Sequence, residues 1–437
     1  MRVAVVGSGI AGLASAWLLS TRHAVTLFEA ATHLGGHTHT HDVELGGGRY
    51  AIDTGFIVFN GTHYPLLTRL LAELQVPTQP TTMSFSVRNE ASGLEYNATR
   101  LGTLFCQHRN LFSPRFLGML RDLLRFYREA PALLDEPAPG PALGEYLAAR
   151  GFGAAFRDEH LVPMAAALWS APPGEVLGFP AQFVVRFMAN HGMLALRGRP
   201  EWRVVRGGSA SYVRALRARW NVRERLACPV RAVRRQADGV LIESAAGTER
   251  FDQVVLACHS DQALALLSDA GELERNVLGA IPYQPNEVLL HTDTSVLPRD
   301  RRAWAAWNAL VPRTTGGRCS VSYCMNLLQG IDAPQTFVVT LNGAGLVRPD
   351  KVLRRLSYAH PLYTAGAVTA QRRRAQLQGQ RRTWFAGAYW GWGFHEDGLR
   401  SALEVARAFG IAWGGAACAS PTAPAAAARL AASGLVA

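Results

Sequence analysis

The chain opens with RVAVVGSGIAGLASAWLLSTRHAVTLFEAATHLGG at residues 2–36, and this stretch decides the fold. The apolar run 2–6 predicts a short buried strand, and the apolar and small residues 13–19 predict a helix. Between them lies GSGIAG at 7–12, and residues 24–28 predict a second strand. A strand that enters a helix through G-x-G-x-x-G and returns to a parallel strand predicts a dinucleotide-binding unit.

Each glycine of this turn has its own task. Gly7 permits the tight turn, Gly9 lets backbone amides approach a pyrophosphate, and Gly12 lets the helix lie close on the sheet. The helix N-terminus adds unpaired amides and a dipole that favour phosphate. Glu29, at the end of the second strand, is placed to accept the ribose hydroxyls of an unphosphorylated adenosine. The residues predicted to hold the dinucleotide here are Gly7, Gly9, Ile10, Ala11, Gly12, Glu29 and Ala30.

A second glycine pair, Gly35-Gly36, comes shortly after Glu29 and is followed by His37. With this pair the chain resembles the flavin-containing amine oxidase superfamily, whose members include monoamine oxidases, protoporphyrinogen oxidases and phytoene desaturases. The resemblance implies noncovalently bound FAD rather than NAD. In the superfamily an arginine usually follows the glycine pair, so His37 departs from the pattern at a contact near the cofactor.

The resemblance extends to three further segments beside the cofactor. It implies that the backbone of 53–55 passes close to the flavin, that a backbone pair at Val230 holds the adenine, and that 387–399 delivers amides to the pyrimidine edge. The superfamily usually has an acid at the position of Ala388, so a substitute is expected from the histidine and two acids at 395–397. The further cofactor residues implied are Gly35, Gly36, His37, Thr38, Asp53, Thr54, Gly55, Val230, Gly387, Ala388, Glu396, Asp397, Gly398 and Leu399.

The predicted fold class is α/β, with a doubly wound, Rossmann-type FAD-binding domain and an inserted substrate domain of mixed sheet and helices. Two insertions interrupt the cofactor domain. The first reads as a mostly helical cap, and the second is richer in strands. The expected segments are 1–80, 200–270 and 376–415 for the cofactor domain, 81–199 and 271–375 for the substrate domain, and 416–437 for a disordered tail.

Length and composition predict a globular protein, since 437 residues with 49% hydrophobic content can form ample cores. No apolar run approaches the roughly 20 residues of a membrane span, and the first strand leaves no room for a signal peptide. We therefore expect a cytoplasmic protein whose six cysteines, none in C-x-x-C spacing, are reduced. The net charge of +12 is nearly all arginine, Lys351 being the only lysine, which indicates coding bias. Nucleic acid is not expected, because no nucleic-acid motif is present.

Three histidines alternate with threonines at His37, His39 and His41. In an extended strand the three imidazoles share one face, as a metal site requires. Polar side chains near a glycine pair also serve as hydrogen-bond partners of phosphate. We favour the cofactor role and expect no metal.

The expected chemistry is transfer of a hydride from a substrate carbon to flavin N5. Desaturation also needs a proton acceptor, and an imidazole has a suitable pKa near neutrality. His395, in the flavin loop, is the candidate catalytic base, with Tyr323 as a weaker one; supporting the loop or flavin is the other interpretation of His395. Tyr323 and Asn326 lie in a strand-rich segment that is the expected floor of the substrate cavity.

Four motifs resemble one bacterial branch of the superfamily, similar to the methyl-fatty-acid desaturase of furan fatty acid synthesis: GGH at 35–37, DTGFIVFN at 53–60, YCMNLLQ at 323–329 and GFHEDGL at 393–399. The resemblance implies an apolar substrate, a methyl-branched fatty acyl chain of a phospholipid. An amine oxidase, a non-redox flavin-dependent isomerase and a flavin-bearing lipid-binding protein remain alternatives. An aromatic amine cage would draw on Tyr389, Trp390 and Trp392.

The helical pattern at 114–134 has an apolar stripe flanked by arginines. Such a helix packs its stripe into a core or lies on an anionic membrane surface. Peripheral membrane contact therefore remains open, and so does the oligomeric state, with a homodimer as one option. The stripe is Phe116, Leu120, Leu123 and Tyr127, and the arginines are Arg115, Arg121, Arg125 and Arg128.

Overall fold

A computed structural model describes residues 1–137, 140–169, 171, 173–195, 198–313 and 320–414. The expected disordered tail at 416–437 lies outside these residues, as do Cys319 and Cys418. Within them, the free thiols are Cys106, Cys228, Cys258 and Cys324.

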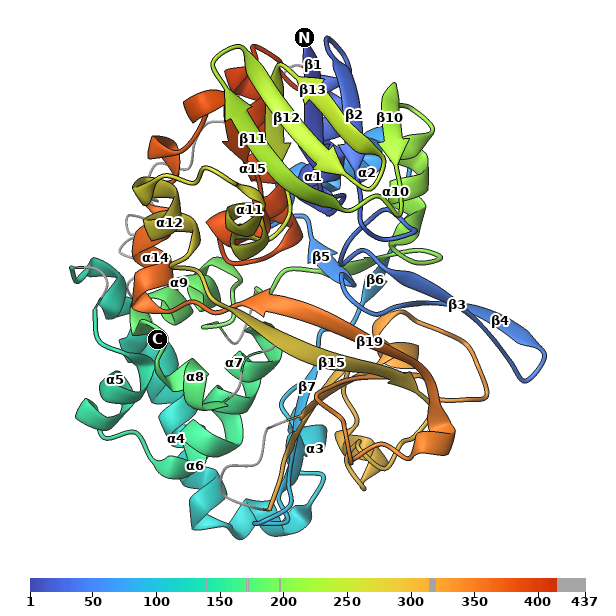
Figure 1. Ribbon diagram of the computed structural model, residues 1–437. Coiled ribbons are helices and arrows are strands. Elements are labelled where there is room, and N and C mark those ends of the chain that lie inside the picture. The colour runs from blue at the N-terminus through green and yellow to red at the C-terminus, as the bar shows by residue number, and fades with distance from the viewer. Residues whose placement is uncertain (138–139, 170, 172, 196–197, 314–319, 415–437) are drawn as a thin grey trace.

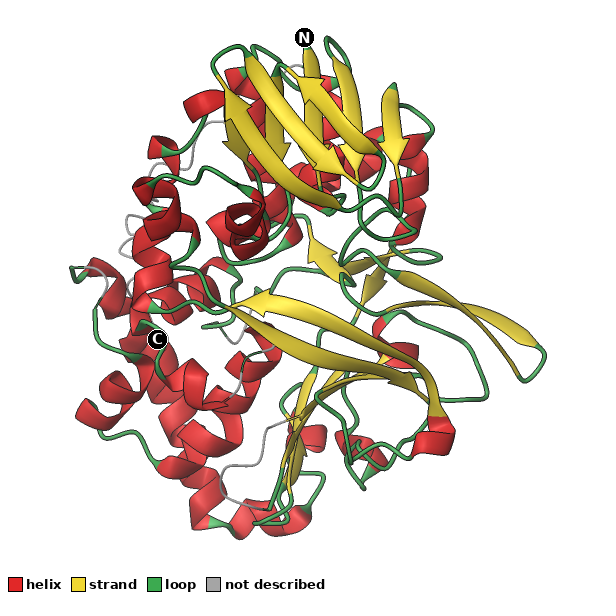
Figure 2. Ribbon diagram, in the orientation of Figure 1, coloured by secondary structure: helices red, strands yellow, loops and turns green. Residues whose placement is uncertain are grey.

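A parallel sheet at one end of the molecule carries the N-terminal motif (Figure 1). Successive side chains of each strand point to opposite faces of this sheet, so the sheet packs against a layer on either side. Val3 and Val5 pack on helices, whereas Ala4 and Val6 pack on a small antiparallel sheet, visible above the helices in Figure 2. In order, the strands are β10 (Val222–Arg225), β2 (Ala24–Phe28), β1 (Arg2–Val6), β14 (Gln253–Leu256) and β20 (Thr383–Phe385). The helices are α1 (Ile10–Leu19), α2 (Pro65–Glu73), α10 (Ala210–Arg217) and α15 (His395–Ala408), and the covering strands are β11 (Val230–Gln236), β12 (Gly239–Ser244) and β13 (Gly247–Phe251).

A mixed sheet forms the second half of the molecule, and all its neighbouring strands are antiparallel except β16 and β7. In order, it runs β19 (Val352–Pro361), β15 (Tyr283–His291), β18 (Val338–Leu341), β17 (Ser320–Cys324), β16 (Trp307–Val311), β7 (Phe85–Asn89) and β8 (Glu95–Asn97). Smaller pairings connect the halves: β3 (Thr40–Leu45) with β4 (Gly48–Asp53), and β9 (Trp202–Val205) between β5 (Val58–Asn60) and β6 (Thr78–Thr81).

Helices cover one side of this sheet (Figure 2). They are α3 (Leu101–Leu104), a 3-10 turn (His108–Phe112), α4 (Pro114–Glu129), a 3-10 turn (Ala130–Asp135), α5 (Leu143–Ala149), α6 (Ala154–Phe156), a π-helical turn (Arg157–Leu161), α7 (Val162–Trp169), α8 (Pro173–Leu177) and α9 (Ala181–Asn190). Within the described parts of the chain, no helix is long and apolar enough to cross a membrane.

The structure corrects the helix prediction at 114–134. The α-helix ends at Glu129, two residues before a proline. Its fully buried face is Phe116, Met119, Asp122 and Phe126, so only Phe116 of the predicted stripe is fully buried. The remaining described helices are α11 (Ser260–Leu266), α12 (Glu272–Leu278), α13 (Met325–Leu328) and α14 (Ala365–Gln371).

Candidate active site

A cavity of about 1550 Å³ begins at the carboxyl ends of β1 and β14 and continues between the mixed sheet and the helical cover. β1 lies in the middle of the parallel sheet, with β2 on one side and β14 on the other. The first part of the cavity lies at the carboxyl ends of these central strands, which is the usual place for a nucleotide in an open parallel sheet. The volume exceeds the roughly 1000 Å³ of a large drug-sized site. There is therefore room for a cofactor and a substrate together.

The glycine turn forms the phosphate end of this cavity. Gly7 has a φ of +96°, and a Cβ on Gly12 would lie 1.9 Å from the Gly7 carbonyl oxygen, so both positions need glycine for the backbone itself. Gly9 is different, because a Cβ there would meet no protein atom within 4 Å and would project into open space. That space beside the start of α1 fits a pyrophosphate.

Glu29 lies at the end of β2 and lines the cavity, as predicted for a ribose ligand. One of its carboxylate oxygens accepts hydrogen bonds from the amide and hydroxyl of Ser8, and the other accepts from the amide of Ala31 at 2.8 Å. A carboxylate has about four acceptor positions, so capacity remains for a ribose hydroxyl. Ala30 and Val230 also line this end.

The second glycine pair lies against the first turn. Gly36 has a φ of +55°, and a Cβ there would lie 3.1 Å from the Cα of Gly9; the Gly35 amide donates to the Ser8 carbonyl. His37 follows and lines the cavity, with a buried Nε2 that has no hydrogen-bond partner among the described residues. Burial and the nearby His360 and His259 lower the pKa of His37, so its imidazole is neutral. A neutral imidazole with an unsatisfied ring nitrogen fits the edge of a bound flavin.

His395 is held by a buried network at the start of α15. Its Nε2 lies 2.9 Å from the Thr38 hydroxyl and 3.2 Å from the Tyr212 hydroxyl, and its ring stacks on Phe56 with 3.7 Å between centroids. Burial lowers the pKa of His395 to about 3. It lines the cavity, as Gly387 and Ala388 do, but its Nε2 is already engaged by the Thr38 and Tyr212 hydroxyls, which suits a positioning role better than that of a base.

Several predicted cofactor residues lie behind the cavity wall. The Asp53 carboxylate accepts from the Ser209 amide at 2.9 Å and from Gln329, and burial raises its pKa to about 6. The Thr54 hydroxyl bonds to Tyr358, whereas Gly55 reaches the cavity. The sequence-implied residues that do not line the cavity are Gly12, Thr38, Asp53, Thr54, Glu396, Asp397, Gly398 and Leu399.

The two acids at 396–397 stabilise the backbone instead of replacing the missing acid at Ala388. Glu396 accepts from the amides of Leu66 and Leu67 at 3.0 Å each, which caps α2, and burial raises its pKa to about 7. Asp397 accepts from the amides of its own loop.

The substrate end of the cavity has an aromatic floor. Trp307 is directly opposite Phe85 on one neighbouring strand and Tyr323 on the other, and all three line the cavity. Tyr323 therefore points inward, as predicted, and burial raises its pKa, so it stays protonated. Asn326 does not line the cavity, because its amide holds the backbone of Ile331, Gln335 and Phe337. The roof comes from helical residues and from the C-cap of α9: Leu123, Tyr127, His160, Met164, Leu168, Phe187 and the C-cap residue His191.

Sequence reasoning missed His160, which lies in the π-helical turn and is 3% exposed. Its Nδ1 lies 2.9 Å from the Tyr96 hydroxyl, which donates to the Glu159 carbonyl. That hydroxyl must then accept from Nδ1–H, so Nε2 carries the lone pair and has no partner in the described structure. Burial lowers the pKa of His160 to about 4. π-helical turns are frequent at functional sites, but the sequence gives no local signal for one.

The aromatic loop does not form a cage from its own side chains. Tyr389 lines the cavity, whereas Trp390 packs into the core beside the parallel sheet and Trp392 packs on Phe187 and His191. The three alternating histidines do not stay together. The ring centroids of His39 and His41 lie 3.9 Å apart, whereas the ring of His37 lies beside that of His360. Among the described side chains, no group of three or more His, Cys, Asp or Glu is arranged to hold a metal ion.

A sequence model of the family described as flavin containing amine oxidoreductase matches residues 10–335. The chain belongs to this family. It is an oxidoreductase whose cofactor is FAD, in keeping with the glycine turn, Glu29 and the unsatisfied His37. No curated protein matches the chain significantly.

Solved structures share the fold over nearly the whole chain. A CLA-producing fatty acid isomerase from P. acnes has 16% identity and a TM-score of 0.65, covering 94% of this chain and 99% of that one. Cyclohexylamine oxidase from Brevibacterium oxydans IH-35A has 18% identity and a TM-score of 0.64, covering 93% and 98%. Putrescine oxidase bound to putrescine has 15% identity and a TM-score of 0.66, covering 94% and 99%. These likenesses establish the α/β fold expected from the sequence.

Proposed function

We propose that this oxidoreductase desaturates a lipophilic substrate, a methyl-branched fatty acyl chain carried on a phospholipid. The observation that carries the proposal is the lining of the substrate end, whose floor is aromatic and whose roof is mostly Leu, Met and Phe. Among the described lining residues, the carboxylates are Glu29 at the ribose end and the exposed Glu201. A buried ammonium would lack a carboxylate partner among these residues at the substrate end, whereas an acyl chain needs none.

FAD, held by the glycine turn and Glu29, would supply the acceptor for a hydride from the substrate. The chain's residues hold and enclose the substrate. Phe85, Trp307 and Tyr323 stand side by side along the floor, with the Trp307 and Tyr323 rings edge to face, and give an apolar wall along which an acyl chain can lie; the roof helices exclude water. In this proposal the neutral His160, with its lone pair on Nε2, is a candidate to accept the proton lost from the neighbouring carbon.

The methyl branch and the phospholipid carrier come from the motif resemblance of the four segments GGH, DTGFIVFN, YCMNLLQ and GFHEDGL. The structural likeness to a fatty acid isomerase supports an acyl chain as the substrate, because that isomerase has the same fold and is named for a fatty acid. The likeness to two amine oxidases keeps an amine substrate as the rival.

Lipid mass spectrometry of cells with and without the protein, supplied with methyl-branched fatty acids, tests the proposal. Acyl species two hydrogens lighter are expected only in cells that make the protein. If no such species forms, while amines bleach the flavin of the purified protein, the amine oxidase function replaces the proposed one. Isomerised acyl chains of unchanged mass would instead favour an isomerase.

A further inference from the structure

The helical cover has an unusual outer surface around α4. Apolar side chains stand exposed in the short stretch 101–124, including Phe112 at 86% and Leu101 at 76% exposure. Of the large hydrophobic residues that are exposed in the described chain, five lie in this stretch and three elsewhere. The five are Leu101, Leu111, Phe112, Leu117 and Leu124, and we call them the apolar rim.

Helix α4 is apolar on two sides. Leu123 and Tyr127 face inward and line the cavity. Leu117 and Leu124 are seven residues apart, so they share a second face, about a quarter turn away, which is exposed. Packing explains the inward apolar face, whereas exposed apolar side chains concentrated in one segment are a mark of an interaction site.

Positive charge accompanies the apolar rim. Residues 98–129 contain six arginines and two acids, one of which, Asp122, is buried. Arg121 and Arg128 lie on the same face as Leu117 and Leu124 and are 78% and 77% exposed. The other two arginines that flank the predicted stripe make contacts within the protein. Arg115 forms an ion pair with the buried Glu159, and Arg125 packs on Phe152.

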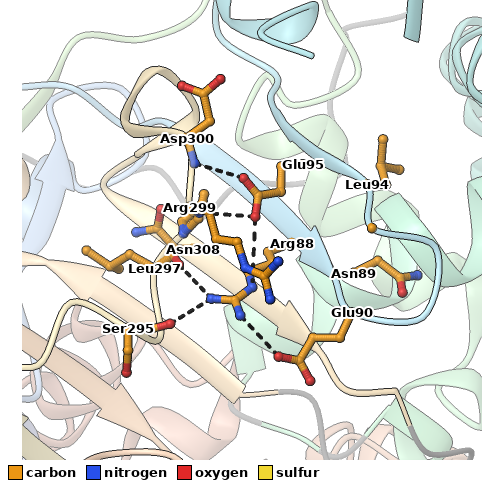
Figure 3. Close-up of polar contacts among 12 residues, drawn as sticks. Arg88, Asn89, Glu90, Leu94, Glu95, Ser295, Leu297, Arg299, Asp300 and Asn308 are labelled. Atoms are coloured by element: carbon orange, nitrogen blue, oxygen red, sulfur yellow. Dashed lines mark hydrogen bonds and ion pairs between the residues drawn. The ribbon is translucent and has the colours of Figure 1, made fainter. Parts of the chain in front are cut away.

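The apolar rim adjoins an opening of the cavity. Ala98 and Thr99 are exposed and also line the cavity, and Leu101 follows two residues later. The strand β8 that leads into this segment is firmly held, as Figure 3 shows. Arg88 donates to the carbonyls of Ser295 and Leu297, and Glu95 accepts from the amides of Arg299 and Asp300 at 3.0 Å each. These contacts fix the position of β8, from which the chain continues to the opening.

We propose that the apolar rim, with Arg121 and Arg128, docks the protein on the surface of an anionic lipid bilayer. Leucine and phenylalanine side chains enter the interface and arginines contact anionic headgroups, as in interfacial amphipathic helices. The opening at Ala98 and Thr99 then faces the bilayer. The proposed docking does not depend on the proposed function. Only the identity of the molecule that enters the cavity, an acyl chain from the membrane, rests on that function.

Co-sedimentation of the FAD-loaded full chain with phosphatidylcholine vesicles, with and without phosphatidylglycerol, tests the docking surface. Phe112→Ser/Leu117→Ser/Leu124→Ser is expected to lower the vesicle affinity at least about tenfold. The matched control is Leu327→Ser/Leu346→Ser, which removes two exposed leucines elsewhere and should bind like the wild type. Every variant is first shown to retain FAD and its melting temperature.

A second pair of variants tests the charge. Arg121→Gln/Arg128→Gln should weaken binding to phosphatidylglycerol vesicles and reduce its sensitivity to salt. Arg234→Gln/Arg250→Gln, on the small antiparallel sheet at the other end of the molecule (Figure 1), should change neither.

Vesicle binding by the wild type that the apolar triple variant retains would overturn the proposal, and so would the absence of wild-type binding. Conversion of a dimer to a monomer by the triple variant, with no vesicle binding, would assign the surface to a second copy of the chain. None of these measurements involves turnover. A protein that bleaches with acyl substrate but ignores vesicles therefore counts against the docking surface alone.

Discussion

Two glycines of the N-terminal turn have opposite surroundings at the scale of single atoms. Gly9 has a φ of −61° and open space at its Cβ position, whereas a Cβ on Gly12 would collide with the Gly7 carbonyl. Gly9→Ala should leave the apoprotein's free energy of unfolding unchanged but weaken FAD binding at least about tenfold, because the methyl group occupies the pyrophosphate space. Gly12→Ala should destabilise the apoprotein by more than about 2 kcal/mol. Urea unfolding and FAD titration measure both; equal destabilisation by the two variants would contradict this assignment.

His395 is a second residue whose role can be tested alone. His395→Asn removes the stack on Phe56 and changes the contacts with Thr38 and Tyr212, so weaker FAD binding and slower flavin reduction are expected. The pH dependence of flavin reduction should keep its shape between about pH 5 and 9, since a group with a pKa of about 3 does not titrate there. Loss of an inflection in the variant would make His395 the base.

At the scale of elements, α15 supports α2 through one side chain. Glu396→Ala leaves the amides of Leu66 and Leu67 buried without an acceptor, at a cost of about 1–3 kcal/mol each. We expect a lower free energy of unfolding with FAD affinity within about twofold of wild type. Arg407→Ala, at an exposed position of the same helix, is the matched control. A large loss of FAD affinity without loss of apoprotein stability would instead place Glu396 at the cofactor.

The sequence predicted the elements whose signal is local. β1, α1 and β2 follow from apolar runs and a glycine turn, and their predicted strand bounds, 2–6 and 24–28, are those observed. The second insertion was expected to be rich in strands, but no particular strand was predicted at β19. β19 exists because it pairs along β15, and a partner distant in sequence leaves no pattern in the strand itself.

At the scale of the whole molecule, buried histidines make stability depend on pH. Burial lowers the pKa of His160, His191, His291 and His360 to about 4 and that of His395 to about 3. The unfolded chain binds protons at these sites near pH 6.5 and the folded chain does not, so stability falls as the pH drops from about 6.5 to 4. Each histidine contributes up to about 1.4 kcal/mol per pH unit.

Two buried carboxyls act in the opposite direction. The pKa of Asp53 is raised to about 6 and that of Glu396 to about 7, so protonation of each favours the folded state below these values. Five imidazoles outweigh two carboxyls, and a net loss of stability on acidification is expected. Urea unfolding at a series of pH values measures it; constant or rising stability below about pH 6.5 would show that these histidines are hydrated.

Some parts of the candidate site are built from residues close together in sequence, and other parts are built from distant segments. The phosphate turn and Glu29 were predicted because cofactor chemistry dictates residues close together in sequence. Asp53 and Glu396 were misplaced because an acid near the cofactor segments can equally satisfy buried amides. The substrate end unites β7, β16, β17 and the helical cover, so Phe85, Trp307 and His160 were recognised only when distant segments met, whereas Tyr323 was already expected at the floor.

Anaerobic reaction of the FAD-loaded protein with a methyl-branched acyl phospholipid tests the proposed oxidation most directly. The yellow absorbance of the flavin is expected to bleach in a single turnover. The recovered acyl chain is expected to be two hydrogens lighter, with its new double bond beside the methyl branch. Flavin that stays oxidised, with lipid of unchanged mass, would contradict the proposed oxidation.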